Sequence, residues 1–259
     1  MRVSVHPGRP ELGAAAAMEA AERLRAACAI QGAATLVIAT GASQFEVLGA
    51  LAAAADVPWG AITIFHLDEY VGLPADHPAS FRRFLRERFI DRLPARPAAF
   101  HGIDGAAPAA AECRRLASLV PAAAFDLALI GIGENAHVAF NDPPADFDTT
   151  AAYLAVVLDE ACRRQQVGEG WFPDLAAVPT TAISMSVRRI LATRTLICSV
   201  PDGRKAEAVR ASLEGPVTPA VPASILRRHP DCRVHLDRAS AALLRPATRD
   251  AGPAPDEAP

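Results

Sequence analysis

Short apolar runs alternate along the chain with longer segments in which apolar side chains recur every three or four positions. The short runs predict buried strands and the periodic segments predict amphipathic helices. We expect strands at 34–40, 61–67, 125–132, 195–200 and 232–236, and helices at 45–55, 80–93, 106–120 and 205–214. Strands that alternate with helices predict an α/β fold: a single-domain, largely parallel twisted sheet with helices on both faces, Rossmann-like.

The length and the composition change this picture at one end of the chain. With 259 residues the chain fits one α/β domain, and we find no internal repeat. We therefore expect a single domain over residues 1–245. Residues 246–259 are proline-rich and polar, which predicts a disordered tail.

Charge and cysteine usage exclude several classes of protein. The net charge is −3, so no basic field attracts nucleic acid or a membrane surface. Apolar runs stay below the roughly 18 residues of a membrane span, and the start lacks the apolar core of a secretion signal. The five cysteines are scattered without a CxxC pair, which is typical of ordinary thiols in a reducing cytoplasm. We therefore expect a cytoplasmic protein without a metal site.

Candidate chemistry gathers where the predicted strands end. In open α/β sheets ligands bind beyond the carboxyl ends of the strands. Four polar segments follow predicted strands, namely 40–43, 68–70, 131–143 and 202–205. Their shared position predicts one site built from four loops.

Two of these segments indicate an anion site. Gly41, Ala42 and Ser43 form a small-residue turn before a helix, where backbone N–H groups can hold a phosphate. Lys205 is the only lysine of the chain and opens another helix, where the helix dipole disfavours a purely structural cation. Ser43 as a helix cap and Lys205 as a solvated surface charge are the structural alternatives.

The other two segments indicate proton transfer. Asp68 ends a strand, where a partly desolvated carboxylate can act as a base, although a turn-capping role is the alternative. His137 lies in the densest polar segment, 131–143, together with two asparagines and two carboxylates. A histidine with an oriented partner can move protons near neutral pH, and we favour this role over a buried structural one.

Several stretches resemble the glucosamine-6-phosphate deaminase (isomerase) family, whose wider group includes 6-phosphogluconolactonases. LDEYVGLPADHPASF is similar to the family's MDEYxGLPxxHPxSY, and GIGENAHVAFNDP is similar to its GxGxDGHIAFNEP. VPTTAISMSV and GRKAEAVRASLEGPV also match, so the resemblance covers about residues 25–245. The Phe-Asn pair at 140–141 favours the deaminase branch, because the lactonases end this stretch differently.

The resemblance implies a role for each matching residue. Asp68 falls on the acceptor of the C2 proton, and His137 falls on the histidine that opens the sugar ring. The phosphate-binding positions it implies are Gly41, Ala42, Ser43 and Lys205. The family's phosphate arginine has no unambiguous match, and Arg163 and Arg164 are the candidates.

Three residues beside the implied site depart from the family pattern. Asn135 replaces the carboxylate two positions before the histidine, Ala136 replaces a glycine, and Asp142 replaces a glutamate. An amide cannot transfer a proton as a carboxylate does, but it can orient His137 by hydrogen bonding. We therefore count Asn135 and Asp142 with Asp68 and His137 as the candidate catalytic residues.

The resulting expectation is an enzyme that converts glucosamine 6-phosphate to fructose 6-phosphate with release of ammonia. It requires no metal or organic cofactor. The alternatives are a 6-phosphogluconolactonase-like hydrolase, a related sugar-phosphate isomerase, or a non-catalytic sugar-phosphate-binding protein. We expect a small sugar phosphate as partner and neither nucleic acid nor membrane, while association into a homo-oligomer stays open.

Overall fold

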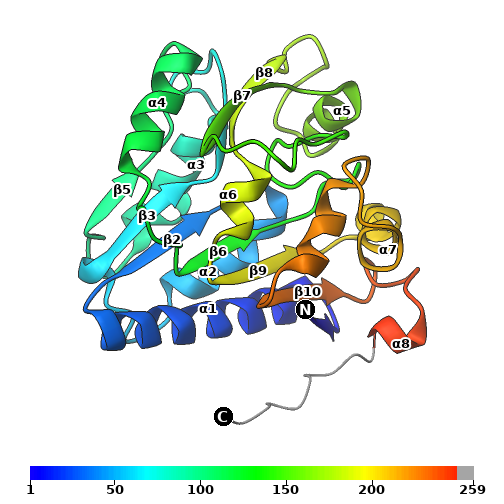
Figure 1. Ribbon diagram of the computed structural model, residues 1–259, viewed down its shortest axis with the longest axis horizontal. Helices are drawn as coiled ribbons and strands as arrows, with labels where there is room; N and C mark the ends of the chain where they lie inside the picture. Colours follow the sequence, from blue (N-terminus) through cyan, green and yellow to red (C-terminus); the bar gives the residue numbers. More distant parts are fainter. Residues whose placement is uncertain (250–259) are drawn as a thin grey trace.

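The computed structural model describes residues 1–249, and a seven-stranded sheet forms its centre (Figure 1). Its order is β1-β10-β9-β6-β2-β3-β5, and every neighbouring pair is parallel. The strands are β1 (Arg2–His6), β2 (Ala34–Ile38), β3 (Ile62–His66), β5 (Ala99–His101), β6 (Leu127–Ile130), β9 (Thr195–Val200) and β10 (Cys232–Asp237). The predicted parallel α/β fold is confirmed, and β10 is its last strand along the chain.

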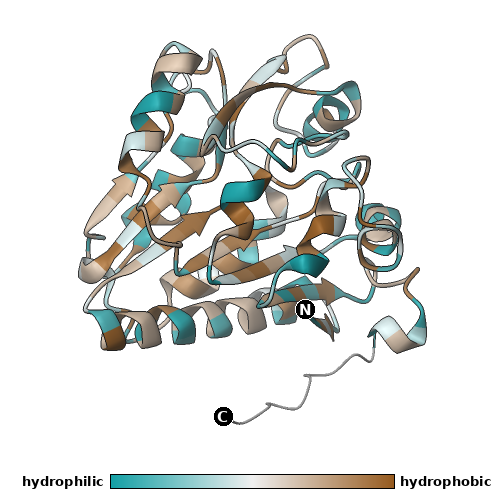
Figure 2. Ribbon diagram, viewed as in Figure 1, coloured by the Kyte–Doolittle hydropathy of each residue, from teal (hydrophilic) through white to brown (hydrophobic). Residues whose placement is uncertain are grey.

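Helices cover both faces of this sheet, because successive side chains of a strand point to opposite sides. Leu36 and Ile38 pack in the core under α1, α2 and α3, whereas Val37 packs in the core under α4, α6 and α7. The apolar colour of the central strands in Figure 2 reflects this burial on both sides. The helices are α1 (Arg9–Gln31), α2 (Phe45–Ala52), α3 (Phe81–Arg88), α4 (Ala109–Leu119), α5 (Glu160–Gly168), α6 (Val187–Leu191), α7 (Ala206–Glu214) and α8 (Pro246–Arg249).

The longest helix, α1, is one that the apolar periodicity did not reveal. It is rich in alanine on every side: Ala16 and Ala20 are fully buried, yet Ala14 is exposed. Because alanine favours helix wherever it stands, the segment forms a helix without the contrast between faces that a periodicity search detects. The edge strand β1 before it was missed as well.

A second, three-stranded antiparallel sheet was not predicted either. It contains β4 (Asp68–Tyr70), β8 (Thr181–Met185) and β7 (Tyr153–Val157) in the order β4-β8-β7. β7 is a continuous apolar run, Tyr-Leu-Ala-Val-Val, that was missed as a strand; beyond the buried Tyr153 its side chains alternate between partly buried and exposed. Its strands come from distant parts of the chain and enter the fold through tertiary pairing. In Figure 1 this sheet lies with α5 above the main sheet.

The order of the parallel strands creates a crevice between β2 and β6. From β2 the chain proceeds through β3 and β5 to one edge, and from β6 it proceeds through β9 and β10 toward the other. Connections that leave in opposite directions open a space beyond the carboxyl ends of these two adjacent strands. The loops at 40–43 and 131–137 start there.

Several predicted boundaries differ from the structure. The helices expected over 45–55 and 106–120 are Phe45–Ala52 and Ala109–Leu119. The helix expected over 80–93 ends at Arg88, and a 3₁₀ turn, Ile90–Arg92, follows it. Residues 246–249 of the expected disordered tail are ordered instead, because Pro246–Arg249 form α8 and the Thr248 hydroxyl donates a hydrogen bond to Glu214 over 2.6 Å. The remainder of that tail, 250–259, lies outside the described residues. None of the helices within residues 1–249 is long and apolar enough to cross a membrane.

Candidate active site

A pocket of about 520 Å³, open solvent at its mouth included, occupies the crevice between β2 and β6. It combines the loops that follow β2, β3 and β6 with one face of α5 and the start of the α7 segment. The polar residues that line it are Thr40, Ser43, Gln44, Asp68, His137, Gln165, Gln166, Glu169 and Lys205. All four polar segments expected to form one site are thus close together in the fold.

The loop after β2 and Lys205 form one end of the pocket. Gly41 has a φ of 92°, a conformation that favours glycine, and residues Ala42–Gln44 form a 3₁₀ turn that leads into α2. The ammonium group of Lys205 donates a hydrogen bond to the hydroxyl of Ser43 over 2.8 Å. Burial lowers the pKa of Lys205, while Glu169 and Glu134 counteract this shift. The structure therefore brings together the residues expected to hold a phosphate.

The two arginines expected to assist Lys205 do not reach the pocket. Arg163 donates to the carbonyl oxygens of Leu175 and Val178, and Arg164 pairs with Glu160 on the exposed side of α5. The expectation that one of them binds phosphate was wrong, because neither side chain lines the pocket. Both point away from it along α5.

The side chains of α5 and its end that do line the pocket are Gln165, Gln166 and Glu169. Gln165 donates to Glu169 over 2.8 Å and accepts from the backbone N–H of Glu134. Sequence reasoning missed all three, although the spacing of four between 165 and 169 fits one helical face. Among residues 1–249, Lys205 is the one lysine or arginine that lines the pocket.

Asp68 is held at the pocket wall without a hydrogen-bonding partner. It follows β3 after Leu67 and begins β4, where it pairs with Ser184 of β8. Its carboxylate is buried, and its Oδ1 atom contacts no donor within the described residues. Burial, aided by the neighbouring Glu69, raises the pKa of Asp68 to about 8. Such a carboxyl group is a base when ionised and is strongly perturbed, as catalytic groups often are.

Glu69, next in the chain, fixes the position of Asp68. Its carboxylate accepts backbone N–H groups from Tyr70, Phe81 and Arg82 and the hydroxyl of Ser80. Burial raises the pKa of Glu69 although these four bonds favour its ionised form. The carboxylate thus joins β4 to the start of α3. Adjacent acidic residues therefore have different surroundings, since one is fully hydrogen-bonded and the other has no partner.

His137 lies on a tight loop that requires a glycine beneath its ring. A Cβ atom on Gly133 would lie 2.2 Å from the imidazole, so only glycine lets the ring occupy this place. Ala136, where the resembling family has glycine, and Ala139 have φ values of 66° and 53°, which alanine rarely adopts. The loop thus stores strain beside His137, as loops at functional sites commonly do.

Behind His137, Asn135 joins two carboxylates. Its amide nitrogen donates to Asp142 and to Asp159, each over 3.0 Å, and its oxygen accepts the backbone N–H of His137 over 3.1 Å. The expected orienting contact therefore exists, but it holds the backbone of His137 rather than its ring. Asp159 was missed because it lies 24 positions away from Asn135, on another loop.

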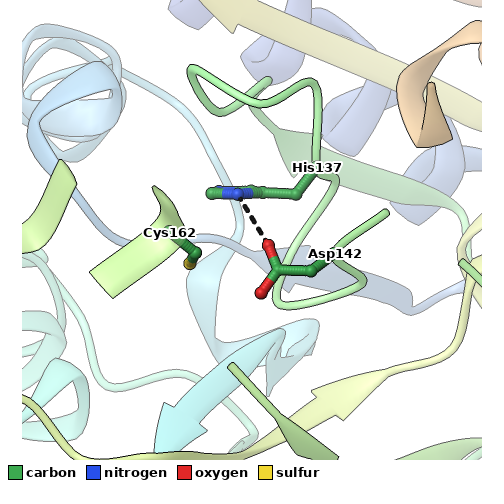
Figure 3. A group of neighbouring side chains, drawn as sticks. All are labelled: His137, Asp142 and Cys162. Atoms are coloured by element: carbon green, nitrogen blue, oxygen red, sulfur yellow. Dashed lines mark ion pairs between the residues drawn. The ribbon is translucent and has the colours of Figure 1, made fainter. Parts of the chain in front are cut away.

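Asp142 faces the imidazole at close range. Its Oδ1 atom lies 3.2 Å from Nδ1 of His137 (Figure 3). The contact lacks the alignment of a good hydrogen bond, since Nδ1 has no hydrogen-bonding partner among the described residues. Burial acts to raise the pKa of Asp142, but His137, Asn135 and the backbone N–H of Asp159 outweigh it and hold that pKa below its ordinary value. Asp142 therefore stays ionised beside the histidine.

Cys162 completes the group drawn in Figure 3. His137, Asp142 and Cys162 each offer a potential metal-ligand atom, all within 4.8 Å of one another. Burial, with the Asp142 and Asp159 carboxylates nearby, raises the pKa of the Cys162 thiol well above its ordinary value. A thiol held protonated against a carboxylate is a poor ligand, because metals bind the thiolate. The donor set thus suits proton transfer better than a metal, and the expectation of no metal stays a prediction.

The fold and the pocket together define a class of protein. The chain is a doubly wound α/β protein whose pocket, at the point where the strand order reverses, is lined by a small-residue loop, a lysine, an aspartate and a histidine. A family model described as glucosamine-6-phosphate isomerases/6-phosphogluconolactonase matches residues 7–234. The chain therefore belongs to this family.

Curated relatives and solved structures agree with this assignment. The chain is 37% identical to a glucosamine-6-phosphate deaminase of Pseudarthrobacter chlorophenolicus, with 82% of each chain covered. It is 32% identical to that of Lactobacillus delbrueckii subsp. bulgaricus, with 95% and 100% covered. A solved monomeric glucosamine-6-phosphate deaminase superposes with a TM-score of 0.85 at 31% identity, covering 94% and 100%. The 6-phosphogluconolactonase of Trypanosoma brucei, at 21% identity and a TM-score of 0.73, shares the fold.

Proposed function

We propose that this protein is a glucosamine-6-phosphate deaminase, which isomerises the amino sugar to fructose 6-phosphate and releases ammonia. One observation carries the proposal. An unpartnered carboxylate, Asp68, and a histidine, His137, line the same pocket as a loop and a lysine suited to a phosphate. The names of the relatives support the same activity.

The phosphate of the substrate would bind the loop 41–43 and Lys205. Backbone N–H groups before α2 and the Lys205 ammonium both attract an anion. Fixing the phosphate fixes the far end of the sugar, so that the reacting carbons stand at defined distances from the proton-transfer groups. The Glu169 carboxylate also lines the pocket and would repel a ligand that carries more negative charge than Lys205 and the loop can balance.

His137 would open the sugar ring by moving a proton between the anomeric hydroxyl and the ring oxygen. Asp142, ionised behind the imidazole, stabilises the positive charge that the ring carries during this transfer. Asn135 holds both the histidine backbone and Asp142 in place.

Asp68 would then take the proton from C2 of the open-chain sugar. That proton is acidified by the adjacent carbonyl group and by the ammonium on C2 itself. The substrate's ammonium also favours the ionised form of Asp68, whose pKa in the free protein is about 8. The resulting enolamine is protonated at C1, and water attacks the imine at C2, so that ammonia leaves and the ketose phosphate remains.

The lactonase alternative uses the pocket less completely. Hydrolysis of a lactone removes no proton from carbon and needs one base to activate water, so it leaves either Asp68 or His137 without a proton-transfer role. A binding protein gains nothing from burying that carboxylate either, because the burial costs stability near neutral pH. Both alternatives therefore explain fewer of the observed features than the deaminase does.

The test measures ammonia and fructose 6-phosphate formed from glucosamine 6-phosphate. Lys205→Ala should raise KM by an amount equal to about 1.5–3 kcal/mol of binding free energy, as for a lost charged hydrogen bond. Arg210→Ala is the control, because Arg210 is an exposed cation on α7 that pairs with Glu207. Unphosphorylated glucosamine should be a very poor substrate. Equal turnover of both sugars, or lactone hydrolysis without ammonia release, would overturn the proposal.

A further inference from the structure

Both N–H donors and the oxygen of the Asn135 amide form hydrogen bonds to groups around the histidine. The two N–H bonds of its amide point to two different carboxylates, Asp142 and Asp159, and its oxygen accepts the backbone N–H of His137. An amide can do this because it offers two donors and an acceptor on one planar group. A carboxylate in the same place would offer two acceptors and no donor.

Asp159 is fixed from the other side. It caps the start of α5, where its Oδ1 atom accepts the backbone N–H of Cys162 over 2.7 Å and leaves Oδ2 for Asn135. Its own backbone N–H donates to Oδ2 of Asp142 over 3.0 Å. Asp159 is thus linked to Asp142 in two ways. Its backbone N–H bonds to Asp142 directly, and its side chain is connected to Asp142 through the amide of Asn135.

Among the described residues, the negative charge of the cluster has one ionisable partner of opposite sign, His137, which faces Asp142. Within residues 1–249, no lysine or arginine forms an ion pair with either Asp142 or Asp159. Donors from Asn135 and from the backbone supply the compensation. The other titratable or charged groups that face Asn135 are His137, Cys162, Glu134, Arg164 and Arg204.

We propose that Asp159 is a positioning residue for the proton-transfer step: together with Asn135 it forms one unit that holds Asp142 and His137 in their working arrangement. Asp159 touches neither substrate nor the reacting atoms, and it acts through Asn135 and Asp142. The inference rests on the proposed function for its catalytic readout. It also explains why asparagine stands at 135, since a carboxylate there would face two others at about 3.0 Å.

The experiment exchanges the amide and the carboxylate between the two positions. Asn135→Asp places three carboxylates together and should lower kcat/KM at least tenfold at pH 8, with a smaller loss at pH 6, where one carboxyl can hold a proton. Asp159→Asn keeps an oxygen for the cap of α5 but loses the acceptor for Asn135, and should lower kcat several-fold with KM little changed. The double variant removes one of the two carboxylate contacts and should recover at least tenfold over Asn135→Asp at pH 8.

Asp174→Asn is the matched control. Asp174 also accepts a backbone N–H three residues further on, from Ala177, but it is exposed and lies outside the pocket. This variant should leave the pH profile of kcat/KM unchanged. A double variant whose losses merely multiply, or an Asn135→Asp variant more active than the parent at every pH, would overturn the proposal.

Thermal unfolding of the parent protein, the two single variants at 135 and 159 and the double variant separates this proposal from the proposed function. The unfolding temperature of Asn135→Asp should fall more at pH 8 than at pH 5, and the double variant should regain most of that loss. If the parent protein releases no ammonia but this recovery occurs, the proposed deaminase fails while the coupled unit stands. If stability shows no coupling, the unit is refuted whatever the activity.

Discussion

Two aspartates near one pocket have opposite environments. Asp68 is buried at the pocket wall without a hydrogen-bonding partner, and its pKa rises to about 8. Asp142 lies behind His137 with donors from Asn135 and from the Asp159 backbone, and its pKa stays below the ordinary value. The same functional group is thus our proposed base for a carbon-bound proton at one place, and at the other it favours its ionised form beside a histidine. The difference teaches that burial and the neighbouring donors and charges, rather than residue type, set the two pKa values.

The largest expected effect comes from removing the base. Asp68→Asn keeps the shape of the side chain but not its basicity, so kcat should fall on the order of 10²–10⁴-fold while KM changes little. In the parent protein kcat/KM should rise with pH through about 8, where Asp68 ionises in the free protein. The measurement is the pH profile of ammonia release. Near-full activity in Asp68→Asn would show that Asp68 is not the base.

A displaced histidine should cost almost as much. Gly133→Ala places a Cβ atom 2.2 Å from the His137 ring, which must then move away from Asp142. A misplacement of about 1 Å can cost on the order of 10²-fold in rate, and we expect a loss of that size in kcat/KM. Gly60→Ala is the control, because a Cβ on Gly60 would meet no atom within 4 Å. Full activity in Gly133→Ala would show that the ring position does not matter.

Asp68 and Asp142 should change the free energy of unfolding with pH in opposite directions. Asp68 keeps its proton in the folded protein up to about pH 8 but loses it near 3.8 when unfolded, so its burial lowers stability as pH rises between these values. Asp68→Asn should therefore raise the free energy of unfolding by about 2–4 kcal/mol at pH 8 and by almost nothing below pH 4. Denaturant titrations at the two pH values measure this difference.

Asp142 should behave in the reverse way. Its folded pKa is depressed, so its contribution to stability is present above the unfolded value of 3.8 and is lost as pH falls through the folded value. Asp142→Asn should destabilise the protein at neutral pH and have a smaller effect in acid. Equal pH dependence in the Asp68 and Asp142 variants would remove the contrast on which the assignment of roles depends.

The smallest expected effect concerns the strained loop that carries His137. Ala136 has a φ of 66°, which glycine adopts without penalty. Ala136→Gly should raise the free energy of unfolding by about 0.5–1 kcal/mol with little change in kcat, because the backbone already has this conformation. A thermal shift assay with an ammonia-release assay checks both. Destabilisation would mean that the Ala136 methyl group, which is buried in the core, contributes more than the strain costs.

The sequence by itself determined the parallel sheet and the place of the site. Continuous apolar strands require cover on both faces, and polar loops after such strands meet at one edge whatever their distance along the chain. For this reason the sequence alone places Asp68, His137, Lys205 and the loop 41–43 at one site, and the structure has them all lining one pocket. These features depend on local pattern and on the parallel topology alone.

Only the tertiary structure decided how each polar side chain is partnered. Arg163 and Gln166 are three positions apart in α5, yet Arg163 donates to the carbonyl oxygens of Leu175 and Val178 while Gln166 lines the pocket. A sequence pattern does not fix which way such long side chains turn, because neighbours on one helical face can bond to different segments. The antiparallel sheet and the bond from Asn135 to Asp159 join segments far apart in sequence. The contrast between Asp68 and Asp142 follows from burial and from donors on other loops, and such contacts arise only when the chain folds.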